Sequence, residues 1–127
     1  MVLCLVDDLL FSVKISTAAK AIAAPIFFER SPDMALARVR EKQPSLVIFD
    51  LNSAKLRPLE IIAQMKADPA LKTTRTLGYV SHVQADVIAA ARAAGIDEVM
   101  ARSAFSDRLG QILSASSTPA TGPAPGE

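Results

Sequence analysis

The chain has few of the residues from which several kinds of site are built. Among its 127 residues there are one cysteine, Cys4, one histidine, His82, and no tryptophan. A single cysteine cannot form an internal disulfide, and one cysteine with one histidine cannot supply the usual ligands of a zinc site. We therefore expect Cys4 to be a small buried residue of a protein that resides in the reducing cytoplasm.

An excess of charge of one sign is also missing. Fourteen Lys and Arg residues balance 13 Asp and Glu residues, for a net charge of +1. Because a nucleic-acid-binding surface usually requires a basic excess, we expect no nucleic-acid partner. Asp7 and Asp8 interrupt the first apolar stretch, and no apolar run approaches the roughly 18 residues of a membrane span. The N-terminus has no basic region or cleavage site of a signal peptide, so we expect no membrane partner.

The composition that is present is ordinary for one folded domain. Half of the residues are hydrophobic and 21% are charged, which excludes global disorder. Residues 114–127 contain three of the eight prolines and two of the five glycines, with no large apolar side chain. We predict a folded domain over residues 1–113 and a disordered tail over residues 114–127.

Short apolar runs alternate with helical patterns along the folded part. Strands are expected at about residues 2–6, 26–28, 46–49, 76–80 and 97–101. Helices are expected at about residues 9–23, 31–42, 58–68 and 83–94, and from residue 106 onwards. This alternation predicts an α/β fold, a doubly wound parallel sheet with two helices on one face and three on the other. The first and third strands are the most apolar and should be central, which gives the flavodoxin-like order 2-1-3-4-5.

Polar side chains end four of the expected strands. Asp7 and Asp8 follow the first, Asp50 the third, Ser81 the fourth and Arg102 the fifth. Ligands of such sheets bind at the carboxyl ends of the strands, so these side chains should meet there. A carboxylate that faces Mg²⁺, a hydroxyl and a guanidinium is a plausible phosphoryl acceptor. The competing interpretation is that Asp7 or Asp8 caps the first helix and Asp50 caps a loop.

Four segments carry a further pattern: VLCLVDD, SLVIFDLN, PLEIIAQMKADPAL and AAARAAGIDEVMARSAF. Their order and spacing resemble the CheY-like receiver domain of two-component response regulators, over residues 1–113. By position, the resemblance implies that Asp50 is the phosphoacceptor and that Ser81 hydrogen-bonds the acyl phosphate. It also implies a weakly held Mg²⁺, with ligands from Asp7, Asp8, Asp50 and the main-chain carbonyl of Asn52.

The resemblance implies a stand-alone signalling protein of a phosphorelay and not an enzyme. The phosphoryl group would come from a histidine kinase or a phosphotransfer protein. Because no DNA-binding domain follows residue 113 in this sequence, output is expected to go through a downstream protein partner. A homodimer is left open.

The chain also departs from the receiver pattern at several positions. Arg102 replaces the usual lysine, Ser103 replaces the proline after it, and Val99 replaces the aromatic switch residue. Arginine keeps the charge, but its planar fork is not interchangeable with an ammonium group. These departures indicate an atypical receiver or a pseudo-receiver. The alternative function is therefore a protein-interaction module that needs no phosphorylation; a small flavodoxin-like enzyme is a third interpretation that no catalytic base or cofactor loop supports.

Three further features have simpler interpretations. His82 is expected to be a partly exposed loop residue, and Tyr79 to pack in the fourth strand with its hydroxyl at an edge. Lys55 and other basic residues of two loops are expected to form a solvated surface, because no aromatic residues interleave with them.

Overall fold

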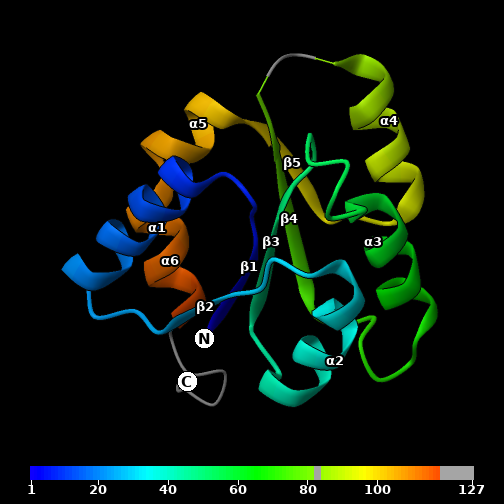
Figure 1. Ribbon diagram of the computed structural model, residues 1–127, viewed down its shortest axis with the longest axis horizontal. Coiled ribbons are helices and arrows are strands. Elements are labelled where there is room, and N and C mark those ends of the chain that lie inside the picture. The colour runs from blue at the N-terminus through cyan, green and yellow to red at the C-terminus, as the bar shows by residue number, and fades with distance from the viewer. Residues whose placement is uncertain (82–83, 118–127) are drawn as a thin grey trace, which may run out of the picture.

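A computed structural model describes residues 1–81 and 84–117 of the chain. Five parallel strands form one sheet in the order β2-β1-β3-β4-β5 (Figure 1). The strands are β1 (Val2–Leu5), β2 (Ile26–Phe28), β3 (Leu46–Asp50), β4 (Arg75–Val80) and β5 (Glu98–Ala101). The predicted fold class and strand order are confirmed.

Burial explains the order of the strands. Every residue of β1 and β3 is buried, because these two strands lie inside the sheet with helices on both faces. The edge strands β2 and β5 are only partly buried. The most continuous apolar runs therefore occupy the centre, as the sequence predicts.

Within the described part of the chain, six helices cover the sheet in two layers (Figure 1). The helices α1 (Leu9–Ala21), α5 (Arg102–Asp107) and α6 (Leu109–Ser117) pack on one face. The helices α2 (Pro32–Lys42), α3 (Pro58–Ala67) and α4 (Ala85–Ala94) pack on the other. The predicted split of two and three helices is wrong, since the last expected helix is two helices separated at Arg108, where φ is −102° and ψ is 8°.

The start of the last helical segment also differs from the prediction. Helix α5 begins at Arg102, directly after β5, so Ser106 lies inside it and does not cap it. A proline disfavours helical backbone at the residue before it, and here the residue after Arg102 is Ser103. Arg102 is therefore free to be helical, and the chain enters α5 without a loop.

Helix α6 continues to Ser117, four residues beyond the predicted end of the folded part. Ala115 and the serines around it fit a helix, and Pro119 follows soon after. The rest of the predicted tail, residues 118–127, lies outside the described residues, as do His82 and Val83. None of the helices that the structure describes is long and apolar enough to cross a membrane.

Candidate functional site

Asp50 ends the central strand β3 at the carboxyl edge of the sheet and is 9% exposed. The Asn52 N–H donates to its Oδ1 at 3.0 Å. Burial raises the pKa of Asp50 above its ordinary value, and the charges of Asp8 and Asp7 act in the same direction. The Asn52 hydrogen bond and the positive charge of Arg102 oppose this rise only in part. Asp50 is thus a buried carboxyl group whose ionised form is disfavoured by burial and by the two neighbouring acids.

Asp8 connects two elements that lie far apart in the sequence. Its Oδ1 accepts a hydrogen bond from the Phe11 N–H at 3.1 Å and so caps α1. Its Oδ2 accepts from Nη2 of Arg102 at 2.9 Å. The Phe11 hydrogen bond first, and Arg102 in addition, hold the pKa of Asp8 below its ordinary value. The capping interpretation is therefore confirmed for Asp8, which nevertheless lies beside the predicted site cation.

Asp7 has a cation of its own. Nζ of Lys55 lies 3.6 Å from its Oδ1, and both side chains are partly exposed. Sequence reasoning assigned Lys55 to a solvated surface and missed this pairing. Asp7 lies just before α1, and Lys55 lies in the loop after β3. Because the two residues are distant in sequence, no local pattern indicates that they pair.

Arg102 lies at the junction of β5 and α5, next to the acids. Its guanidinium carbon lies 4.3 Å from the centre of the Phe11 ring, in addition to the pairing with Asp8. The side chain is 35% exposed, so it is partly withdrawn from water. The predicted cation at the end of β5 is thus placed at the acidic end of the sheet.

The donor chemistry of the site suits Mg²⁺, since carboxylates and a main-chain carbonyl are hard oxygen ligands. In this structure, however, the side chains are not arranged as the ligands of one metal ion. Within residues 1–81 and 84–117, no group of three or more Asp, Glu, His or Cys side chains is placed to hold a metal ion. The predicted grouping of Asp7, Asp8 and Asp50 around one ion is therefore absent from this conformation, in which Lys55 and Arg102 pair with two of the acids.

Asn52 holds the neighbouring loop through its side chain. Its Oδ1 accepts from the Ser81 N–H, and its Nδ2 donates to Oε1 of Gln84, the residue that precedes α4. Ser81 is exposed and lies at the end of β4. Through these two hydrogen bonds the Asn52 side chain connects the loop after β3 with the end of β4. No pattern in the sequence indicates the hydrogen bond with Gln84.

The hydroxyl of Tyr79 does not lie at an edge, so that prediction is wrong. Tyr79 is 1% exposed, and its hydroxyl forms no hydrogen bond with any described residue. Its ring stacks on Phe105 at 5.0 Å between centroids and packs against Phe11 at 4.9 Å. The alternation of side chains along β4 indicates that Tyr79 is buried, because it places Tyr79 on the same face of the sheet as the buried Leu77.

Two cavities differ in their relation to this site. An open cavity of about 550 Å³ adjoins it and is lined by Phe11, Lys14, Ser81, Ala101, Arg102, Ser103 and Ser106. Its cations and hydroxyls suit the oxygen atoms of an anion.

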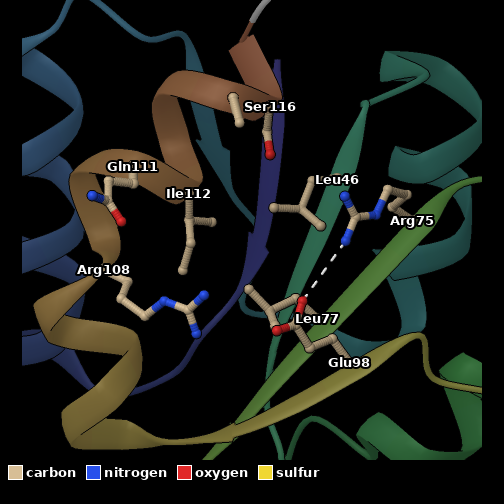
Figure 2. A pocket seen from close by; sticks show the side chains of 9 residues that line it. Leu46, Arg75, Leu77, Glu98, Arg108, Gln111, Ile112 and Ser116 are labelled. Atoms are coloured by element: carbon tan, nitrogen blue, oxygen red, sulfur yellow. Dashed lines mark ion pairs between the residues drawn. The ribbon is translucent and has the colours of Figure 1, made fainter.

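A second cavity, of about 210 Å³, lies between α6 and the strands (Figure 2). Arg75 and Glu98 face one another across part of it, with Nη2 3.8 Å from Oε1, and Arg108 enters from the helix side (Figure 2). It shares no lining residue with the candidate site.

No protein-family model matches the sequence, and no curated protein matches it either. Solved structures do match. A response regulator from Hahella chejuensis aligns with a TM-score of 0.81 and 21% identity, over 92% of this chain and 94% of that one. The phosphorylated cyanobacterial phytochrome response regulator RcpA aligns with a TM-score of 0.74 and 23% identity, over 90% and 88%. The chain has the fold of a response-regulator receiver domain.

A third receiver-fold structure is that of response regulator Rcp1 in its Mn²⁺-bound form. It aligns with a TM-score of 0.75 and 19% identity, over 97% of this chain and 98% of that one. The receiver fold places the ends of β1, β3, β4 and β5 at one edge of the sheet, where the predicted site residues lie. In this chain the cation at that edge is Arg102, which pairs with Asp8.

Proposed function

We propose that this receiver-fold chain is a signalling protein of the cytoplasm whose phosphoacceptor is Asp50. The observation that carries the proposal is the pairing of Arg102 with Asp8, which puts a permanent positive charge next to a buried acceptor carboxylate. Phosphoryl transfer requires positioning and neutralisation of charge more than covalent help from the protein. The chain therefore has an acceptor and a cation in neighbouring positions, and it is not proposed to be an enzyme.

In the proposed reaction, an Asp50 carboxylate oxygen attacks the phosphorus of a phosphohistidine on a kinase or phosphotransfer protein. A P–O bond forms as the P–N bond breaks, and the leaving imidazole nitrogen takes a proton from solvent. Arg102 neutralises charge on the transferred oxygens, and the Ser81 hydroxyl hydrogen-bonds one of them. A downstream protein partner then recognises the phosphorylated form.

The ligands for Mg²⁺ would come from Asp7, Asp8, Asp50 and the main-chain carbonyl of Asn52. When bound, the ion supplies neutralisation of the charge that builds up on the phosphoryl oxygens. Asp8 has one carboxylate oxygen on the Phe11 N–H and the other on Arg102. Arg102 therefore competes with the ion for Asp8.

The second candidate function is a protein-interaction module that needs no phosphorylation. The same Asp8 contacts favour it, because an acid used as a helix cap and an ion-pair partner has a structural reason to be present. Ser103 and Val99, which replace the proline and the aromatic residue of the receiver pattern, favour it too.

Labelling with a small phosphodonor in the presence of Mg²⁺ separates the two functions. We expect intact-mass measurements to show one added phosphoryl group on the wild type and none on Asp50→Asn. Arg102→Lys should label at least as well as the wild type, since an ammonium group restores the usual cation of the pattern. If neither the wild type nor Arg102→Lys is labelled, the phosphorylation-independent function holds.

A further inference from the structure

The cavity between α6 and the strands lies at the edge of the sheet opposite to the candidate site (Figure 2). It has a volume of about 210 Å³ and is lined by the first residues of β4 and β5, Arg75 and Glu98. Ser81 and Arg102 of the candidate site follow the other ends of the same two strands. The side chains of this cavity therefore have no part in the proposed phosphoryl transfer.

Two charged side chains of the cavity occupy helix-facing positions of the sheet. Because side chains alternate along a strand, Arg75 lies on the same face of β4 as the buried Leu77. Glu98 is the register partner of Leu77 across β4 and β5, so it lies on that face as well. This is the face on which α6 packs. The cavity thus has charged groups where a closed core would have apolar ones.

The guanidinium groups have unused hydrogen-bond donors. Nη2 of Arg75 lies 3.8 Å from Oε1 of Glu98, which is longer than a hydrogen bond. Arg108, at the junction of α5 and α6, points into the cavity from the helix side (Figure 2). No acid in the described part of the chain pairs with it. Two guanidinium groups and one carboxylate give the cavity a net charge of +1, which a ligand with one negative charge balances.

The floor of the cavity is apolar, and its helical wall is anchored. Leu46 and Leu77 are each 3% exposed, and Ile112 of α6 packs against the same core. The Ser45 hydroxyl donates to the main-chain carbonyl of Ser116, which ties the end of α6 to the residue before β3. The cavity is therefore formed before any ligand binds, as ligand sites usually are.

Size and charge together limit the class of ligand. Pockets for drug-sized ligands have about 300–1,000 Å³, so this cavity fits a smaller molecule. A carboxylate matches the forked donors of a guanidinium group. A phosphate dianion would bring a second negative charge next to Glu98 and would leave the apolar floor uncovered.

We propose that this cavity binds a small organic monocarboxylate. Its carboxylate lies between Arg75 and Arg108, and its short aliphatic or aromatic body covers the apolar floor. The proposal does not depend on phosphorylation of Asp50, because the cavity shares no lining residue with that site.

Titration of the full chain with benzoate and with hexanoate, at constant ionic strength, tests the proposal. We expect saturable NMR shifts at the first residues of β4 and β5 and along α6, with a Kd on the order of 1 mM for one acid or both. The amide of the acid that binds, which lacks its charge, should bind roughly tenfold more weakly. Absence of saturable shifts with both acids, or equal binding of acid and amide, overturns the proposal.

Variants of the lining residues identify the groups that hold the carboxylate. Arg108→Gln should weaken binding of the acid roughly tenfold, because it removes one charge-assisted contact. Glu98→Gln should strengthen binding roughly threefold, because it removes the negative charge beside the carboxylate. Arg92→Gln, on the exposed side of α4, is the matched control and should bind like the wild type. Wild-type affinity in Arg108→Gln, or weaker binding in Glu98→Gln, contradicts the proposal.

Inorganic phosphate is the competing ligand. It should bind the wild type more weakly than the acid does, since it has no apolar body to cover the floor. Tighter binding of phosphate than of either acid would overturn the assignment to a monocarboxylate. Labelling of Asp50 is measured separately, so failure of the proposed function leaves these titrations decisive.

Discussion

At the scale of single residues, two neighbouring acids of the site have pKa values that are shifted in opposite directions. Asp50 is buried at the end of β3, and burial raises its pKa. Asp8 lies at the first turn of α1, and its hydrogen bond from Phe11, together with Arg102, lowers its pKa. Burial thus disfavours the ionised form of Asp50, whereas its partners favour the ionised form of Asp8.

The raised pKa of Asp50 has a consequence for stability. A carboxylate whose pKa is raised on folding is penalised once it ionises, so the wild type loses stability as the pH rises through the folded-state value. Asp50→Asn removes the penalty and should raise the free energy of unfolding at pH 7 by on the order of 1 kcal/mol. The gain should shrink as the pH falls towards the ordinary pKa of 3.8 and vanish below it, where the acid is protonated in both states.

Urea denaturation of both proteins at several pH values measures this difference. Asp33→Asn serves as the control, since that acid is exposed on α2. A gain from Asp50→Asn that does not vary with pH would contradict the ionisation argument.

Arg102 should compete with a divalent ion for Asp8. Removing the guanidinium with Arg102→Gln frees one oxygen of Asp8 and takes a positive charge away from the acids. We expect Mg²⁺ to bind roughly tenfold more tightly to this variant, an effect of about 1.4 kcal/mol. Calorimetric titration measures the affinity, with Arg92→Gln on the exposed side of α4 as the matched control. Identical affinity in the wild type and Arg102→Gln would show that Arg102 does not occupy a metal-binding acid.

At the scale of elements, the direct passage from β5 into α5 decides where the cation lies. Arg102 is the first residue of α5, and Phe105 follows one turn later, fully buried against Tyr79 and Phe11. Docking of Phe105 into this aromatic cluster fixes the helix, and the helix in turn carries Arg102 towards Asp8. The ion pair therefore depends on the backbone at Arg102 being helical.

Ser103→Pro tests that dependence. The new ring disfavours helical backbone at Arg102, so the start of α5 should move and the Asp8 pair should weaken. We expect a loss of stability of about 1–2 kcal/mol, with chemical-shift changes that spread from α5 to the first turn of α1. Ser103→Ala is the control, since it keeps the helix and removes only an exposed hydroxyl. A proline variant as stable as the alanine variant would show that the helical start is unimportant.

At the scale of the whole molecule, the sheet separates two hydrophobic cores. One core lies under α1, α5 and α6, and the other under α2, α3 and α4 (Figure 1). Residues of β1 and β3 contribute to both by alternation, so neither core can form without the central strands. The two cores should therefore unfold together, in one cooperative transition.

Small deletions on the two faces test this cooperativity. Ile15 of α1 and Ile62 of α3 are both fully buried, one in each core. Ile15→Val and Ile62→Val should each lower the free energy of unfolding by about 1 kcal/mol, and their effects should add in the double variant because they share no partners. Circular dichroism and the fluorescence of Tyr79 should report the same unfolding midpoint in every variant. Separate midpoints for the two faces would contradict a single cooperative unit.

The local pattern of the sequence determines most of the architecture. Fully apolar runs predict β1 and β3 at the centre, and their spacing predicts a parallel sheet in the observed order. The same reasoning places Asp7, Asp8, Asp50, Ser81 and Arg102 at one edge of the sheet. These inferences succeed because burial in a parallel sheet and the direction of its strands follow from composition and order alone.

Only the tertiary structure decides how these residues are paired. Asp8 joins Arg102 across 94 positions of sequence, and Lys55 joins Asp7 across a loop, so neither pairing has a periodic signal. Ring packing by α1 and α5 likewise leaves the Tyr79 hydroxyl without a hydrogen bond to any residue that the structure describes. Contacts of this kind depend on the distances and rotamers that packing selects, whereas the sequence pattern specifies only which face each side chain occupies.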